Sequence, residues 1–140
     1  MKKFLFAWVA VATLACVGCS KDDESLTPSV ATLVGKWEVY RICDEGRWHD
    51  LGEGHNKRRI YEFYDDNTGR FMAWNPQDEW YSEDFTYEID GNTLEYRGRG
   101  WNEVDTIIIT KLTTSKLEFE WHVLENGRDY VGLYYLERIE

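Results

Sequence analysis

Residues 33–140 consist of short segments in which apolar and polar residues alternate, separated by turn sequences. At 116–124, KLEFEWHVL places apolar side chains at every second position, and Asn126-Gly127 follows closely. Successive side chains of a β-strand point to opposite faces, so this alternation predicts strands with one buried and one solvated face. Asn-Gly is a strong signal for a two-residue hairpin turn. The pattern therefore predicts an all-β domain of antiparallel strands.

The same reasoning predicts eight strands, joined mostly by short connections. They span residues 35–43, 59–65, 69–75, 83–90, 93–98, 103–111, 116–124 and 129–138. Consecutive hairpins form an up-and-down meander, and closing a meander removes the strand edges that promote aggregation. We therefore predict an eight-stranded antiparallel up-and-down barrel, either filled by side chains or holding one small ligand. A two-sheet β-sandwich is the alternative.

The first 18 residues have the features of a secretory signal. Lys2 and Lys3 precede an apolar stretch of about fifteen residues, which fits the core of a signal peptide and is short for a membrane-spanning helix. Val17-Gly18-Cys19 then resembles the lipobox of bacterial lipoproteins, in which small residues precede a cysteine that is acylated before cleavage. We predict a signal peptide at 1–18 and a lipid anchor at Cys19. A permanent N-terminal membrane anchor is the alternative.

A charged stretch, KDDE at 21–24, favours Cys19 over Cys16 as the acylated residue, because apolar Val17 would follow cleavage at Cys16. Such a stretch resembles the export signal that sends some Gram-negative lipoproteins to the outer face of the outer membrane. Cell-surface display is therefore predicted, with the periplasmic face as the alternative. Charged, Ser-rich segments cannot bury enough apolar surface to fold, so residues 19–32 are predicted to be the lipidated cysteine and a flexible tether. The barrel domain then spans 33–140.

The charge of the chain limits its partners. The net charge is −10, and loss of residues 1–18 with their two lysines would make it −12. Nucleic acid binding requires a basic surface and is not expected. We expect a monomer that contacts the membrane only through its acyl chains. Cys43 would then have no disulfide partner, and its place at the end of a strand predicts a buried, inert thiol rather than a reactive one.

Gly35-Lys36-Trp37 resembles the first strand of the lipocalin-like lipoproteins of Gram-negative bacteria. The resemblance extends to YEF at 61–63 and ITKLT at 109–113, and it covers most of residues 33–139. In lipocalins this tryptophan lies across the closed end of the barrel, and an arginine of the last strand packs over it. The resemblance therefore implies barrel-closing roles for Trp37 and Arg138.

The inward phase of the predicted strands selects six candidate ligand-binding residues. They are Tyr61, Phe63, Phe85, Tyr87, Phe119 and Trp121. Further aromatic residues lie in or beside loops, where they either cap the barrel ends or surround a ligand at the barrel mouth. Three nearby polar side chains could supply the polar groups of such a site. The aromatic residues are Trp48, Trp74, Trp80 and Trp101, and the polar ones Tyr81, Arg97 and Arg99. Because binding sites combine aromatic walls with a few polar groups, we predict binding of a small apolar or glycan ligand.

Two alternatives to a ligand carrier follow from the same residues. A solidly packed barrel could bind a protein or glycan through its loops and outer surface. Glu118 and Glu120 are roughly 7 Å apart along a strand, as a glycosidase pair would be, but they lie on the solvated face. His49 and His55 lack the four-ligand pattern of structural zinc. We predict no enzymatic activity, no cofactor and no metal.

Overall fold

The computed structural model describes residues 24–75, 77, 79–100 and 102–140. Within these residues the chain forms one short helix and nine strands. They are α1 (Val30–Leu33), β1 (Gly35–Asp44), β2 (Arg47–Asp50), β3 (Arg58–Phe63), β4 (Thr68–Asn75), β5 (Glu79–Asp90), β6 (Thr93–Gly98), β7 (Asp105–Leu112), β8 (Lys116–Glu125) and β9 (Arg128–Arg138).

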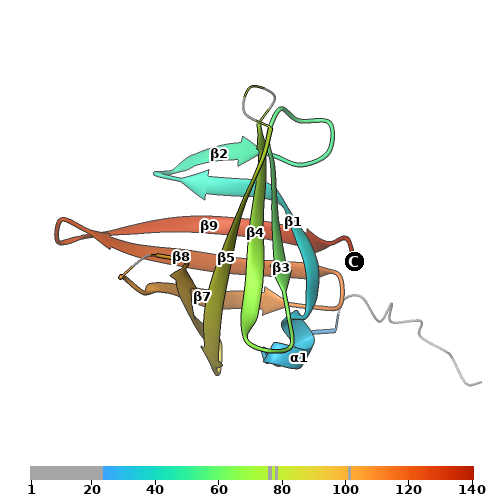
Figure 1. The fold of residues 1–140 in the computed structure, drawn as a ribbon, viewed down its shortest axis with the longest axis vertical. Coiled ribbons are helices and arrows are strands. Elements are labelled where there is room, and N and C mark those ends of the chain that lie inside the picture. The colour runs from blue at the N-terminus through green and yellow to red at the C-terminus, as the bar shows by residue number, and fades with distance from the viewer. Residues whose placement is uncertain (1–23, 76, 78, 101) are drawn as a thin grey trace, which may run out of the picture.

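Strands β1 and β3 to β9 form a closed antiparallel barrel (Figure 1). Each pairs with its neighbour along the chain, and β9 returns to β1, where Trp37 lies opposite Arg138 and Val39 opposite Leu136. The predicted eight-stranded up-and-down barrel is confirmed. The sandwich alternative is wrong, because β1 pairs on one edge with β3 and on the other with β9, leaving no gap between two sheets.

The structure adds one strand, β2, between the predicted strands at 35–43 and 59–65. β2 extends β1 as a hairpin in which Arg41 lies opposite Asp50. All four β2 residues are exposed, so no apolar alternation marks the strand in the sequence. Glu45 and Gly46 both have positive φ angles, as a type I′ hairpin turn requires. Cys43, in the β1 arm of this hairpin, is a buried free thiol, as predicted.

Part of the predicted tether at 19–32 belongs to the folded domain. The Leu26 amide donates a hydrogen bond to the Leu112 carbonyl at 2.8 Å, and Leu26 and Val30 pack against the core. The Ser29 side chain caps α1 by accepting a hydrogen bond from the Thr32 amide. The prediction of a flexible tether up to residue 32 is corrected here, because the apolar side chains of Leu26 and Val30 pack against the barrel core.

The predicted signal peptide at 1–18, the candidate acylation sites Cys16 and Cys19 and most of the charged stretch lie outside the described residues. Their roles stay predictions. In the part of the chain that the structure describes, no helix is long and apolar enough to span a membrane.

Trp37 and Arg138 close the end of the barrel beside α1. Trp37 is fully buried, and its indole N–H donates to the Leu33 carbonyl at 2.8 Å. The Arg138 guanidinium lies 4.1 Å from the centre of the Trp37 ring. It also donates hydrogen bonds to the backbone carbonyls of Thr32, Val34 and Thr114. One side chain therefore ties α1, the start of β1 and the β7–β8 turn to the last strand.

Arg138→Lys tests this arrangement. Lysine keeps the positive charge but cannot reproduce a planar fork that reaches three carbonyls, so we expect a loss of about 2–4 kcal/mol in the free energy of unfolding. Urea denaturation measures the change. The exposed Arg128→Lys is the matched control and should change stability by less than about 0.5 kcal/mol. Equal stabilities for the two variants would contradict the role given to Arg138.

Candidate functional site

The six predicted ligand-binding residues all point into the barrel, where five of them are almost completely buried and Trp121 is partly buried. Their rings pack against one another and against neighbouring tyrosines. Ring centroids are 5.2 Å apart in Phe63–Tyr87, 4.6 Å in Phe85–Tyr96, 4.8 Å in Tyr96–Trp121 and 5.0 Å in Phe119–Tyr134. The middle of the barrel is therefore filled by aromatic side chains.

Two of the six, Tyr61 and Trp121, also line a cleft at the barrel mouth with a volume of about 350 Å³. Its other walls are formed by Asp44, Glu103, Asp105, Val123, Tyr130, Gly132 and Tyr134. Asp44 ends β1, whereas Trp37 lies near its start, so the cleft is at the opposite end from the Trp37–Arg138 closure. Gly132 lies opposite Trp121 in the β8–β9 pair and has no side chain to fill the space.

A wider cleft of about 600 Å³ adjoins the first one and shares Asp44 and Tyr134 with it. The β2 hairpin and the loop before β3 form its walls, which include His49 and His55. Among the described residues, no group of three or more His, Cys, Asp or Glu side chains is placed to hold a metal ion. His49 and His55 therefore line a cleft but belong to no group of metal-ligating side chains among the described residues.

Burial governs the electrostatics of the mouth. It raises the pKa of the Asp105 carboxyl, although a hydrogen bond of 3.1 Å from the Trp121 indole opposes the shift. Burial also raises the pKa of Tyr61 and of Tyr134, against the effect of the nearby Arg59 guanidinium. Both phenols thus stay protonated at neutral pH and can donate hydrogen bonds. The mouth combines aromatic walls, neutral phenols and carboxylates.

The family model of the lipocalin-like domain matches residues 33–119. The chain belongs to this family. A lipocalin-like protein from Bacteroides uniformis has 15 % identity over 77 % of this chain and 99 % of its own, with a TM-score of 0.59. A Bacteroides eggerthii protein has 12 % identity over 76 % and 98 %, with a TM-score of 0.57. Bovine odorant-binding protein, solved with a selenium-containing odorant, has 17 % identity over 84 % and 77 %, with a TM-score of 0.51.

At these identities the solved structures show the shared fold alone. Among curated proteins, none matches this chain.

Among the described residues, the other aromatic and polar side chains predicted at the barrel ends do not line the mouth cleft of about 350 Å³. Trp48 and Trp80 are about half-exposed and lie over Arg41 and Arg58. Trp74 is partly buried and pairs with Trp80 across β4 and β5, and Tyr81 is exposed. Arg97 and Arg99 line a groove on the outer wall, and Trp101 lies outside the described residues.

Sequence reasoning missed most of the charged and tyrosine side chains at the mouth. Asp105 shares the inward phase of Ile107 and Ile109, and Tyr130 and Tyr134 share that of Leu136. Alternation alone could have found them. They were missed because the candidates were restricted to strand centres, whereas these residues lie toward the strand ends that form the mouth.

Asp105→Asn tests the burial of the mouth carboxylate. Because its pKa in the folded state lies above the ordinary value of 3.8, the folded chain holds this proton more tightly than the unfolded chain. Its contribution to stability is therefore present below pH 3.8 and is lost as the pH rises through the raised pKa. Asn can still accept the Trp121 hydrogen bond, so the variant should be more stable than the natural chain at pH 7 and similar near pH 3.

Urea denaturation between pH 3 and 7 measures this difference. Asp90→Asn, at the end of the β5–β6 hairpin, is the control for loss of an exposed carboxylate and should follow the natural chain. A stability difference for Asp105→Asn that does not grow with pH would contradict the interpretation.

Proposed function

We propose that this lipocalin-like protein is not an enzyme and binds a small ligand at its barrel mouth, while anchored outside the cytoplasm by acyl chains on Cys19. The mouth cleft carries the proposal. Its volume of about 350 Å³ is in the range of small-molecule sites, and its aromatic walls carry a few polar groups, as such sites do. The bovine odorant-binding protein, which shares the fold, was solved with a selenium-containing odorant, and this also supports a small ligand.

The packed interior determines where the ligand would lie. Tyr61 and Trp121 contact each other at 6.1 Å between ring centroids, and Trp121 contacts Tyr134 at 5.7 Å. These rings form a floor that separates the mouth from the lower barrel. A ligand of the proposed kind, apolar or a glycan, would rest on this floor and face Tyr130, which is 38 % exposed.

Binding of the neutral fluorescent probe N-phenyl-1-naphthylamine tests the mouth site. We expect enhanced probe fluorescence with the natural chain and an affinity about tenfold lower for Tyr130→Ala, because one aromatic wall is removed. Trp80→Ala is the control, since Trp80 is an exposed aromatic residue that does not line this cleft. Unchanged affinity of Tyr130→Ala, or no binding at all, would count against the mouth as the binding site.

A second candidate function is supported by the apolar residues exposed around the open end. They lie on the β1–β2, β4–β5 and β8–β9 hairpins and are Trp48, Trp80, Tyr81, Leu124, Tyr130 and Val131. Exposed apolar groups on the hairpins at one end of a domain are candidates for an interaction surface. A protein or glycan partner held by this rim is the alternative, and it would make binding sensitive to Trp48→Ala and Trp80→Ala rather than to changes inside the cleft.

The attachment of the chain near α1 supports an orientation for the anchored protein. Leu26 is hydrogen-bonded to the end of β7, at the closed end of the barrel (Figure 1). The seven residue steps from Cys19 to Leu26 can span at most about 25 Å. If Cys19 is acylated, the closed end is held near the membrane and the mouth faces away from it, toward the medium or the periplasm.

Cys19→Ala tests the anchor in a Gram-negative host. We expect loss of acylation and release from the membrane fraction, because stable attachment needs two or more acyl chains on this cysteine. Mass spectrometry of the N-terminal peptide and cell fractionation measure both effects. Cys16→Ala is the control and should remain lipidated. Continued lipidation of Cys19→Ala would show that Cys16 is the acylated residue.

A further inference from the structure

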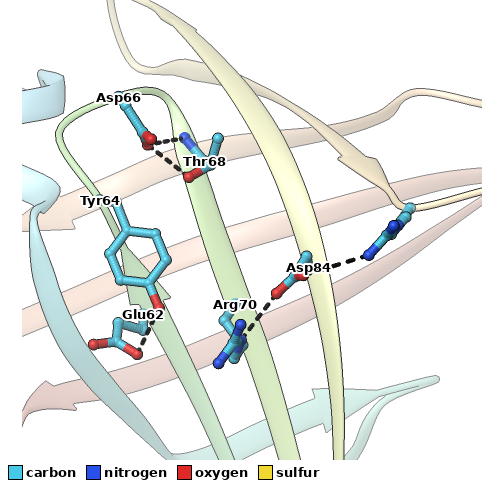
Figure 2. Close-up of polar contacts among 7 residues, drawn as sticks. Glu62, Tyr64, Asp66, Thr68, Arg70 and Asp84 are labelled. Carbon is cyan, nitrogen blue, oxygen red and sulfur yellow. Dashed lines mark hydrogen bonds and ion pairs between the residues drawn. The ribbon is translucent and has the colours of Figure 1, made fainter.

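A groove of about 610 Å³ runs over β4, β5 and β6 on the outer wall of the barrel. Its polar lining residues are Tyr64, Thr68, Arg70, Asp84, Thr86, Arg97 and Arg99. Figure 2 shows part of this wall, with Tyr64 on one side and Arg70 facing Asp84 on the other. None of these residues lines the mouth cleft, so the groove is a separate feature.

The pairing of the strands explains why the wall is hollow here. Thr68 and Thr86 lie opposite each other and point outward with short side chains. The next row across the strands is Gly69, Phe85 and Gly98, in which the Phe85 ring points into the barrel. Because the Phe85 ring faces the interior and two of the three residues are glycines, this row presents mainly backbone to the outer surface. The floor is therefore backbone and short side chains, while longer side chains form the walls.

The groove is locally basic in an acidic chain. Three arginines and a single carboxylate line it, although the whole chain has a net charge of −10. Asp84 accepts a hydrogen bond from Arg70 Nε at 2.9 Å and lies 3.8 Å from Arg99 Nη1. Arg97, beside Thr86, is exposed and makes no ion pair within the described residues. Arg97 can therefore offer its whole planar fork, the group that best matches a carboxylate.

The remaining groups suit the hydroxyls and ring of a sugar. The Tyr64 hydroxyl donates to Glu62 Oε2 at 3.0 Å, which holds the phenol ring beside the groove. Thr86 is exposed and adds a hydroxyl to the groove lining. We propose that this groove binds a carboxylate-bearing saccharide, with its carboxylate held by Arg97 and its ring between Tyr64 and Thr86. The site is independent of the ligand proposed for the barrel mouth.

Titration of the full chain with digalacturonate, followed by amide NMR, tests the proposal. We expect shifts concentrated at Thr86, Arg97 and Gly98, and none of comparable size with lactose, a neutral disaccharide. Arg97→Gln should weaken binding about tenfold, because one charge-assisted contact is removed. Arg128→Gln, which removes an exposed charge from the β8–β9 hairpin, is the matched control and should leave the affinity unchanged.

Three outcomes would overturn the proposal: no shifts with digalacturonate, equal affinity for lactose, or equal affinity for inorganic phosphate at the same amides. The last would mean that the groove takes any anion. An unchanged amide spectrum of free Arg97→Gln outside the groove shows that the variant folds. Binding of N-phenyl-1-naphthylamine to the same variant should be unaffected, so failure of this site and failure of the mouth site can be distinguished.

Discussion

The pairing of β9 with β1 is the contact on which the rest of the structure depends. It converts a meander of hairpins into a barrel with no open edge between first and last strands. Arg138 reinforces it, because its guanidinium covers the Trp37 ring and binds three backbone carbonyls from other segments. The hydrogen bonds satisfy a cation that burial would otherwise make costly, and burial accordingly lowers the pKa of Arg138. The closed end is thus a polar junction built around one charged side chain.

Aromatic side chains fill the barrel interior above that junction, so the candidate binding sites lie at the surface of the molecule. Rings from β3, β5, β6, β8 and β9 fill the middle of the barrel, and the two candidate clefts lie at the mouth and on the outer wall. The two proposed sites have opposite electrostatic character. Asp44, Glu103 and Asp105 line the mouth, whereas three arginines line the outer groove. One small domain can therefore present two chemically distinct surfaces.

Most of the fold could be predicted because strand alternation and turn chemistry are local properties. The hairpin at Asn126-Gly127 and the inward phase of Phe119 follow from neighbouring residues alone. The β2 strand could not be predicted in this way, because its four exposed residues carry no alternation and depend on β1 for their pairing. The hydrogen bond between Leu26 and Leu112 joins residues far apart in the sequence, so local patterns could not predict it either.

The sequence by itself therefore determined the strand order, the inward aromatic residues and the pair that closes the barrel, because each depends on local periodicity or on a family motif. Only the tertiary structure decided which inward residues reach open space. A register shift at Val39/Arg41 changes the phase within β1, so the inward position of Asp44 at the mouth cannot be obtained by extending the alternation of Trp37 and Val39. Strand pairing also places Arg97 and Arg99 on the outer wall rather than at the rim. Those positions depend on how distant strands align when the barrel closes.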